Sequence, residues 1–340
     1  MKKIKENEEN REIIPIMFCF DKNYVIPAAV AFYSLLENAN SKMFYKLYVL
    51  HSDISLEQQN KLQETIKEYH NICTLEFMDM NNKFNDIWEN MKSKVHFSKE
   101  VLYKLLVGSI FPQYDKIIVS DVDVVFQGDI SKSFEVIQPA DEEYIAGVKP
   151  IGVLKQFNSV YENKFSESDI NKLNMICGGY LIFNLKRIRD EEIEKKFIKC
   201  LNDNVKNIIY AEQDILNLCC YNKMKFLPLN YIVCTYMWYL YEPKTLMDND
   251  GVYTKKQILD AMKNPIQLHY ASTEKPWKNV DTEKSEIWFE YIVKTTFLKE
   301  YLQLLPKMIV IKNEIKKDHK NNIIRKAKRI IKKTLRRFYE

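Results

Sequence analysis

Glycine and long apolar runs are scarce in this 340-residue chain, and both shortages restrict what the protein can be. With seven glycines and ten prolines, it is neither collagen-like nor of low complexity. No run approaches the ~18 consecutive apolar residues of a membrane-spanning helix, so none is expected. Hydrophobic residues make up 46% of the chain and charged residues 29%. This balance predicts a packed core, in one large domain with an appendage or in two modest domains.

Cysteine is present but lacks the spacing of a metal site. The seven cysteines are an odd number, and most of them stand inside apolar runs, as buried reduced thiols do. The first twelve residues are charged and are not followed by the apolar core of a secretory signal. Together these features predict a cytoplasmic protein without a disulfide scaffold.

Positive charge is concentrated at one end of the chain. Residues 307–340 hold thirteen Lys or Arg against three acidic residues, a local balance of +10. The whole chain is at +5, so the remainder is at −5, which argues against a nucleic-acid groove across the main body. Residues 321–339 place apolar side chains at helical spacing between basic ones, a pattern typical of binding to an anionic membrane surface. A solvated charged tail and a nucleic-acid patch are the alternatives.

Strand and helix patterns alternate through the first half of the chain. Short apolar runs predict strands at residues 14–19, 45–50, 73–78, 116–119 and, much later, 266–269. Periodic segments predict helices at residues 24–36, 55–69, 99–111, 187–201 and 212–220. The alternation indicates βαβ units and therefore an α/β fold with a mostly parallel sheet. Ligands of such sheets bind beyond the carboxyl ends of the strands, where Asp21, Asp121 and Asp123 fall.

The sequence Asp121-Val122-Asp123 ends an apolar strand. Two carboxylates at positions i and i+2 of an extended chain point to one side and offer hard oxygen ligands for Mg²⁺ or Mn²⁺. An acidic turn that caps the strand is the alternative. His269 ends another short strand and has the imidazole to complete such a site, and Lys275 follows within reach of a metal-bound phosphate. A histidine buried in the core is the alternative for His269.

Three further segments place polar or flexible groups where a ligand could bind. Residues 21–24 follow the first strand and offer groups for a base and ribose, or else cap a helix. Residues 177–179 contain two adjacent glycines that let backbone approach a ligand, or else form a bulge. Residues 212–214 begin a helix with two acidic side chains. These could contact a ligand, or else they interact favourably with the helix dipole. The aromatic residues at 236–241 form either a sugar-stacking platform or ordinary packing.

Taken in order, four blocks of the sequence resemble the retaining glycosyltransferases of family 8. The family includes bacterial lipooligosaccharide galactosyl- and glucosyltransferases and, more distantly, glycogenin. The matching blocks are residues 103–131, 179–186, 213–217 and 269–277. The resemblance spans about residues 14–277, most of the chain.

The resemblance implies a GT-A fold, in which a Rossmann-like, mixed but mostly parallel sheet is flanked by helices. Residues 1–284 would form the catalytic domain, and residues 285–340 a C-terminal helical region with the basic tail. The implied donor is UDP-galactose or UDP-glucose, with Mn²⁺ or Mg²⁺ on its diphosphate. The implied metal ligands are Asp121, Asp123 and His269.

The resemblance also assigns residues to the donor. Those implied to bind it are Asp21, Asn23, Tyr24, Lys104, Asp121, Val122, Cys177, Gly178, Gly179 and Lys275. Those implied to act in catalysis are Glu212, Gln213 and Asp214, with Gln213 below the anomeric carbon. The sequence departs from the family pattern at four positions, where the family usually has Arg, Asn, Asp and Gly: Lys104, Cys177, Glu212 and Ser272. Most of these changes surround the expected sugar pocket, so they bear on which sugar is bound.

The expected function is retaining transfer of galactose or glucose to a hydroxyl of a bacterial surface glycan. The acceptor would be a glycan or lipid-linked saccharide of lipooligosaccharide or lipopolysaccharide type, at the inner face of the cell membrane. A protein acceptor and an inactive membrane-associated scaffold are the alternatives. The sequence has no GxxxxGK[ST] loop, which opposes a nucleotidyl or phosphoryl transferase. Gln213 is a poor nucleophile and Asp214 would need to swing in, so front-face attack is favoured.

Overall fold

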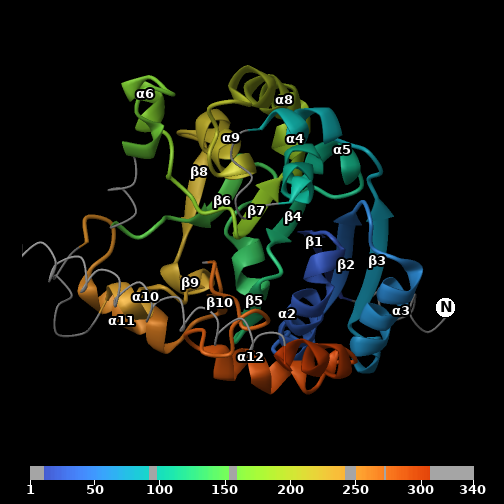
Figure 1. Ribbon diagram of the computed structural model, residues 1–340. Coiled ribbons are helices and arrows are strands. Elements are labelled where there is room, and N and C mark those ends of the chain that lie inside the picture. Colours follow the sequence, from blue (N-terminus) through green and yellow to red (C-terminus); the bar gives the residue numbers. More distant parts are fainter. Residues whose placement is uncertain (1–10, 92–97, 153–158, 242–249, 272, 307–340) are drawn as a thin grey trace, which may run out of the picture.

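The computed structural model describes residues 11–91, 98–152, 159–241, 250–271 and 273–306. At its centre is a seven-stranded sheet in the order β3-β2-β1-β4-β7-β6-β8 (Figure 1). Its strands are β1 (Glu12–Cys19), β2 (Met43–His51), β3 (Cys73–Asp79), β4 (Lys116–Ser120), β6 (Ile145–Val148), β7 (Tyr180–Asn184) and β8 (Met224–Leu227). Only β7 runs antiparallel to its neighbours, which confirms the expected mixed, mostly parallel sheet.

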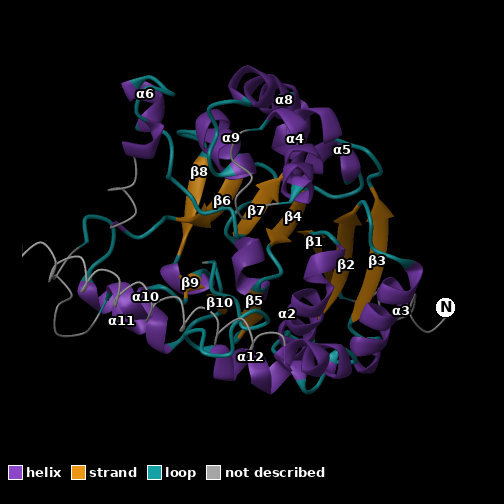
Figure 2. Ribbon diagram, in the orientation of Figure 1, coloured by secondary structure: helices purple, strands orange, loops and turns teal. Residues whose placement is uncertain are grey.

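A second, smaller sheet lies beside the first (Figure 2). Its strands are β5 (Val124–Phe126), β9 (Val233–Cys234) and β10 (Gln267–His269), with β10 in the middle. β10 is antiparallel to β5 and parallel to β9. Only residues 121–123 separate β4 of the large sheet from β5 of the small one. The Asp121-Val122-Asp123 motif therefore stands at the junction of the two sheets.

Helices connect the strands and cover both faces of the large sheet. The α-helices are α2 (Val25–Glu37), α3 (Leu56–Thr65), α4 (Asn85–Asn90), α5 (Val107–Ile110), α6 (Glu167–Ile170), α7 (Leu185–Asp190), α8 (Ile193–Asn204), α9 (Ala211–Cys220), α10 (Met237–Leu240), α11 (Lys255–Lys263) and α12 (Ser285–Ile292). The 3₁₀ helices that matter below are η1 (Lys22–Tyr24), η2 (Lys67–Tyr69), η3 (Lys99–Leu106), η4 (Ser131–Glu135) and η6 (Leu229–Tyr231). Figure 1 shows α2 and α12 on one side of the large sheet and α8 and α9 on the other.

Strand β1 shows why the core has two layers. Ile16 and Phe18 pack into the cluster that includes α2, whereas Met17 and Cys19 pack into the cluster that includes α8 and α9. Successive side chains of a strand point to opposite faces, so a strand covered on both sides must be apolar throughout. Each fully buried side chain of this size contributes about 1.5–3 kcal/mol by leaving water.

Three predicted helices are divided in the structure. The segment expected at 187–201 is α7 followed by α8, because Glu192 adopts a left-handed conformation with φ of 53°. The segment expected at 99–111 is the 3₁₀ helix η3 followed by the short α5. The segment expected at 55–69 is α3, which begins at a capping box formed by Ser55 and Gln58, followed by η2.

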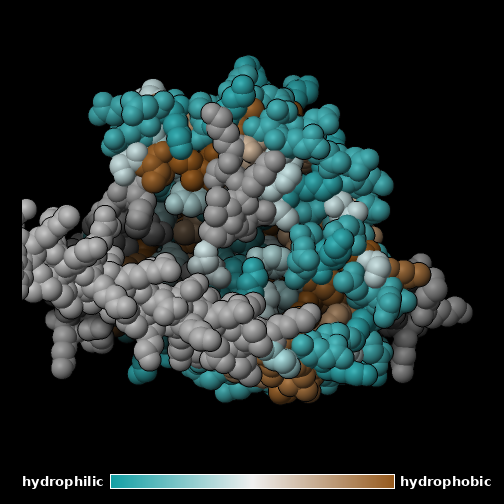
Figure 3. Space-filling view, in the orientation of Figure 1, coloured by the Kyte–Doolittle hydropathy of each residue, from teal (hydrophilic) through white to brown (hydrophobic). Residues whose placement is uncertain are grey.

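The described part of the C-terminal region packs onto the main body. Trp288 on α12 is fully buried, and its ring lies 5.8 Å from that of Trp277. A boundary between residues 284 and 285 stays a prediction, and the predicted basic helix at 321–339 lies outside the described residues. Within the described part of the chain, we find no helix that is both long and apolar enough to cross a membrane. Hydrophilic side chains cover most of the described surface on the face shown in Figure 3.

Candidate active site

Backbone hydrogen bonds bring the motif at residues 121–123 and strand β10 together. The amide of Asp121 donates to the carbonyl of Gly179 at 3.0 Å. The amide of Tyr270 donates to the carbonyl of Asp123 at 2.9 Å, and His269 pairs with Val124 across the small sheet. His269 is 146 positions after Asp123 and 148 after Asp121 in the sequence, but the junction of the two sheets brings it beside both aspartates.

Asp121, Asp123 and His269 form a cluster suited to a divalent cation. One ligand atom from each residue lies within 4.8 Å of the others. His269 Nε2 is 3.1 Å from Asp123 Oδ1 and 3.7 Å from Asp121 Oδ2. Two carboxylates and an imidazole that face one another are a donor set that Mn²⁺ and Mg²⁺ accept, so these residues fit such an ion.

Lys275 brings positive charge to the same cluster. Its Nζ donates to Asp123 Oδ2 and to the carbonyl of Tyr270, each at 2.5 Å, and the residue is buried. Burial opposes ionisation of Asp123, but Lys275 and His269 hold the pKa of that carboxyl well below its usual range. Burial would also lower the pKa of His269, but the Asp123 carboxylate raises it to about 10. Asp123 is therefore ionised, with the Lys275 ammonium and the His269 imidazole against its two oxygens.

Lys104, on η3, connects Asp121 to a second carboxylate. Its Nζ lies 2.7 Å from Asp121 Oδ1, 2.8 Å from Glu212 Oε1 and 3.0 Å from the carbonyl oxygen of Gly178. The side chain is 1% exposed. Burial would lower the pKa of Lys104, but Asp121 and Glu212 raise it above its usual range. The ammonium therefore stays charged between two acids.

Glu212 has one oxygen paired and one free. Its Oε1 accepts from Lys104, whereas its Oε2 is buried and has no hydrogen-bond partner among the described residues. Burial raises the pKa of Glu212, and Lys104 opposes that rise. An unpaired buried carboxylate oxygen costs free energy unless a ligand donates to it, so Oε2 marks a position for a donor group.

The next two residues of α9 point to different surroundings. Gln213 Oε1 accepts from the amide of Gly178 at 2.7 Å, which places Gln213 beside Lys104 and Glu212. Asp214 is fully buried, and its Oδ1 accepts from the Tyr161 hydroxyl at 2.6 Å. Its Oδ2 accepts from two backbone amides, those of residues 209 and 210, at 2.7 and 3.0 Å. Oδ2 of Asp214 thus holds the start of α9, and Oδ1 connects the helix to Tyr161.

The adjacent glycines at 178 and 179 each contact a different part of the site. A Cβ added at Gly179 would lie 2.6 Å from His269 Cε1 and 2.8 Å from His269 Nδ1. A Cβ added at Gly178 would lie 3.1 Å from Glu212 Oε1. The missing side chains therefore allow β7 to start directly against the site residues.

The segment after β1 lies at the carboxyl edge of the large sheet. Asp21 caps η1, because its Oδ1 accepts from the Asn23 amide at 2.9 Å and its Oδ2 from Asn23 Nδ2 at 3.0 Å. The capping alternative is thus observed. The Tyr24 ring lies 5.8 Å from the Trp277 ring at 75°, and burial, followed by negative charge on Asp123, raises the Tyr24 pKa. Tyr24 therefore lies near the Asp123 cluster.

For Val122 and Cys177, two expected donor-binding residues, the structure shows no side-chain hydrogen bond to the Asp123 cluster among the described residues. The contact between Tyr161 and Asp214 was not predicted. The Val122 side chain is buried in the hydrophobic core. Cys177 is bonded through its amide to the carbonyl of Val148, and burial raises the pKa of its thiol. Tyr161 supports Asp214, yet it stands 53 positions earlier, and nothing in its local sequence indicates that role. Ser272 lies outside the described residues.

The mixed, mostly parallel sheet with helices on both faces is the expected GT-A fold. The model of the family described as "Glycosyl transferase family 8" matches residues 15–281, and this chain belongs to that family. It is therefore a glycosyltransferase, as the four sequence blocks predict.

The chain is also similar to several named proteins. The chain is 26% identical over 291 residues to "General stress protein A" of Bacillus subtilis, covering 83% of this chain and 93% of that protein. It is 23% identical over 321 residues to "Lipopolysaccharide 1,2-glucosyltransferase" of Escherichia coli, covering 94% and 88%. The fold matches the galactosyltransferase LgtC, solved "in complex with donor and acceptor sugar analogs", with a TM-score of 0.65. That match has 18% identity and covers 83% of this chain and 96% of LgtC.

Proposed function

We propose that this glycosyltransferase moves galactose or glucose from a UDP-sugar to a hydroxyl of a bacterial surface glycan, with a divalent metal and retention at the anomeric carbon. Relatives named as a lipopolysaccharide 1,2-glucosyltransferase and a lipopolysaccharide 1,3-galactosyltransferase support the hexose and the acceptor class. The observation that carries the proposal is the convergence of Asp121, Asp123 and His269 within 4.8 Å.

On this proposal, Asp121, Asp123 and His269 hold Mn²⁺ or Mg²⁺. The bound ion would act as a Lewis acid on the diphosphate and stabilise the charge on departing UDP. Lys275 supplies a second positive charge beside the diphosphate, because its Nζ already lies against Asp123. At the end of β1, Asp21 and Asn23 bind the ribose and Tyr24 lies against the uracil.

The donor sugar binds on the side of the site formed by η3 and α9. The free Glu212 Oε2 accepts a hydrogen bond from a sugar hydroxyl, and Lys104 holds that carboxylate in place. Gln213 is fixed by the Gly178 amide and offers its remaining amide group below the ring. The hydroxyl pattern of the preferred hexose is then selected by Glu212, Lys104 and Cys177.

Retention is proposed to follow front-face attack, in which the acceptor hydroxyl approaches from the side that UDP leaves. Asp214 is fully buried and its two oxygens accept three hydrogen bonds. To act as a nucleophile it would have to break these bonds and leave two backbone amides unsatisfied. We therefore assign Asp214 to positioning α9. Trapping of a glycosyl adduct on Asp214 or Glu212 would contradict front-face attack.

The test is release of UDP from a panel of UDP-sugars in the presence of Mn²⁺. We expect release from UDP-galactose or UDP-glucose, loss of the activity with EDTA, and a drop of about 10³-fold or more in Asp123→Ala. Asp115→Ala removes an exposed carboxylate near β4 and should keep full activity. UDP release that survives EDTA and Asp123→Ala would contradict the proposal.

Two further measurements distinguish a glycan acceptor from a protein acceptor and from an inactive scaffold. Transfer of radiolabelled hexose to a lipooligosaccharide preparation supports a glycan acceptor, whereas label on the protein itself would favour a protein acceptor. UDP binding without transfer to any acceptor would favour the inactive scaffold.

We also propose that the protein binds the inner face of the cell membrane through residues 307–340, which lie outside the described part of the chain. Thirteen basic residues there favour an anionic surface. Deletion of residues 307–340 should release the protein from phosphatidylglycerol vesicles and leave UDP release unchanged. Vesicle binding that is unaffected by the deletion would contradict this proposal.

A further inference from the structure

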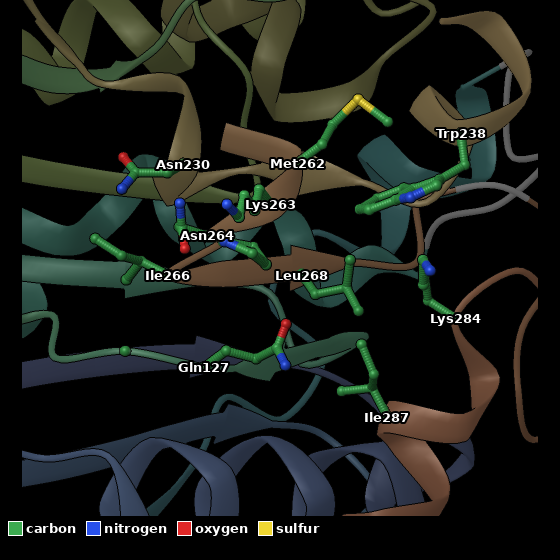
Figure 4. A pocket seen from close by; sticks show the side chains of 12 residues that line it. Gln127, Asn230, Trp238, Met262, Lys263, Asn264, Ile266, Leu268, Lys284 and Ile287 are labelled. Atoms are coloured by element: carbon green, nitrogen blue, oxygen red, sulfur yellow. The ribbon is translucent and has the colours of Figure 1, made fainter. Parts of the chain in front are cut away.

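A cavity lies on the other side of strand β10 from the Asp123 cluster (Figure 4). It has a volume of about 640 Å³, within the range of small-molecule sites. Leu268 lines it, and successive strand residues point to opposite faces, so the cavity and His269 are on opposite faces of the small sheet. The other lining residues are Gln127, Gly128, Asn230, Trp238, Met262, Lys263, Asn264, Pro265, Ile266, Lys284 and Ile287.

Two amide side chains in this cavity have acceptors without a partner. Gln127 Oε1 and Asn230 Oδ1 are both buried and make no hydrogen bond to any described residue. Their backbones, by contrast, are each bonded to Ile266. The Gln127 amide donates to the Ile266 carbonyl at 2.8 Å, and the Ile266 amide donates to the Asn230 carbonyl at 2.7 Å. These two bonds hold both residues beside the start of β10 and leave their side-chain amide oxygens for a donor such as a hydroxyl.

An aromatic ring and two lysines complete the lining. Figure 4 shows Trp238 and Lys284 at one end of the cavity and Asn230 and Asn264 at the other. Lys284 Nζ lies 5.1 Å from the Trp238 ring centroid, and it also lies 3.9 Å from Glu283 and from Glu286, which offset part of its charge. Lys263 at the end of α11 adds a second ammonium. None of the twelve described lining residues is acidic.

We propose that this cavity binds a saccharide unit that carries a phosphate or a carboxylate. The C–H face of a pyranose ring packs on Trp238, as apolar surfaces pack on aromatic rings. Its hydroxyls donate to Gln127 Oε1 and Asn230 Oδ1, which satisfies both buried acceptors. Its anionic group pairs with Lys263, which has no acidic partner among the described residues, while Lys284, whose charge Glu283 and Glu286 partly offset, adds positive charge at the Trp238 end. This second site goes beyond the transfer reaction and does not depend on the donor that the enzyme uses.

The test is direct binding to the full-length protein, measured by isothermal titration calorimetry with UDP and Mn²⁺ in saturating amounts. The probes are glucose 6-phosphate, glucuronate, glucose and inorganic phosphate. We expect saturable binding of glucose 6-phosphate, of glucuronate, or of both, at least about tenfold tighter than binding of glucose or of phosphate. The better of the two anionic sugars identifies a phosphate or a carboxylate as the recognised group.

Variants assign the binding to this cavity. Trp238→Ala and Lys263→Gln should each weaken binding at least about tenfold, the latter without touching the core because Lys263 is exposed. Tyr239→Ala on the same helix, where Tyr239 is 62% exposed, and Lys256→Gln on α11 are matched controls that should bind normally. Asp123→Ala should abolish UDP release and leave this binding unchanged, so the second site is tested separately from the transfer reaction.

Three outcomes would overturn the proposal. Binding of glucose or inorganic phosphate as tightly as the anionic sugars would show that the cavity does not recognise the combined ligand. Failure of every probe to bind would show that the cavity does not bind anionic saccharides. Normal binding by Lys263→Gln, together with Trp238→Ala if that variant folds, would place the ligand elsewhere.

Discussion

The candidate site has two sides that are charged in opposite ways. On the proposed metal side, formed by Asp123, His269 and Lys275, one carboxylate contacts an imidazole and an ammonium. On the proposed sugar side, formed by Lys104, Glu212 and Gln213, the Lys104 ammonium contacts the Glu212 carboxylate, the Gly178 carbonyl and also Asp121 from the metal cluster. Lys104 is the cation that Asp121 and Glu212 share, so its loss would leave both carboxylates without that partner. We therefore expect loss of Lys104 to lower the stability of the folded protein. On the metal side, we expect displacement of a ligand side chain to weaken binding of the metal ion.

The largest effect on stability is predicted for Lys104→Met. It leaves Asp121 and Glu212 without their common cation, and loss of one partner of a buried ion pair costs about 3–5 kcal/mol. The measurement is urea-induced unfolding followed by circular dichroism. Lys132→Met, at an exposed position on η4, is the control and should change stability by less than about 0.5 kcal/mol. Equal stability of the two variants would show that the buried network does not hold the sugar side together.

The adjacent glycines allow the two sides to be disturbed one at a time. Gly179→Ala forces the His269 ring to move, because the new Cβ would lie 2.6 Å from it, so Mn²⁺ affinity should fall about 10- to 100-fold. Gly178→Ala instead presses on Glu212 at 3.1 Å, which should raise the KM for the UDP-sugar and leave Mn²⁺ affinity nearly unchanged. Calorimetric titration with Mn²⁺ separates the two variants. The same loss of Mn²⁺ affinity in both would show that the two sides do not act separately.

A smaller effect is expected in the pH dependence of stability of the metal-free protein. The pKa of Asp123 is lowered in the folded state, so its stabilising contribution is present above its ordinary value of 3.8 and is lost as pH falls below that value. The pKa of Glu212 is raised, so its contribution is present below its ordinary value of 4.5 and is lost as pH rises through the folded pKa. The two sides therefore respond to acid in opposite directions.

Unfolding of the wild type, Asp123→Asn and Glu212→Gln in EDTA at several pH values checks these signs. The wild type should lose its advantage over Asp123→Asn as the solution is acidified below about pH 4. It should lose its advantage over Glu212→Gln as the pH rises above about 4.5. Parallel pH profiles for all three proteins would contradict the assigned pKa directions.

The metal side could be predicted from local sequence and the sugar side only in part. Asp121 and Asp123 follow an apolar strand with the spacing of paired ligands, and His269 ends another strand, so their positions at the sheet edge follow from the alternation of strands and helices. Lys104 could be assigned to the donor only through the family resemblance. Its partner Glu212 is 108 positions away, on an element that packs beside it only in the folded chain.

The boundaries of elements were less predictable than their order. The division between α7 and α8 depends on the left-handed backbone of Glu192, a residue whose type does not favour that conformation. Tyr161 likewise gives no local signal, because its importance comes from the buried Asp214 carboxylate that it contacts. Both features arise from tertiary packing, which hydrophobic periodicity does not encode.

The central claim is that the junction of the two sheets is a metal site for a nucleotide-sugar. Its most direct test is to measure Mn²⁺ binding by electron paramagnetic resonance in the presence of UDP. The account predicts one bound Mn²⁺ in the wild type and in His70→Ala, whose imidazole is exposed on the surface. It predicts loss of that binding in Asp123→Ala and in His269→Ala. Mn²⁺ binding at wild-type affinity in both of these variants would contradict the account.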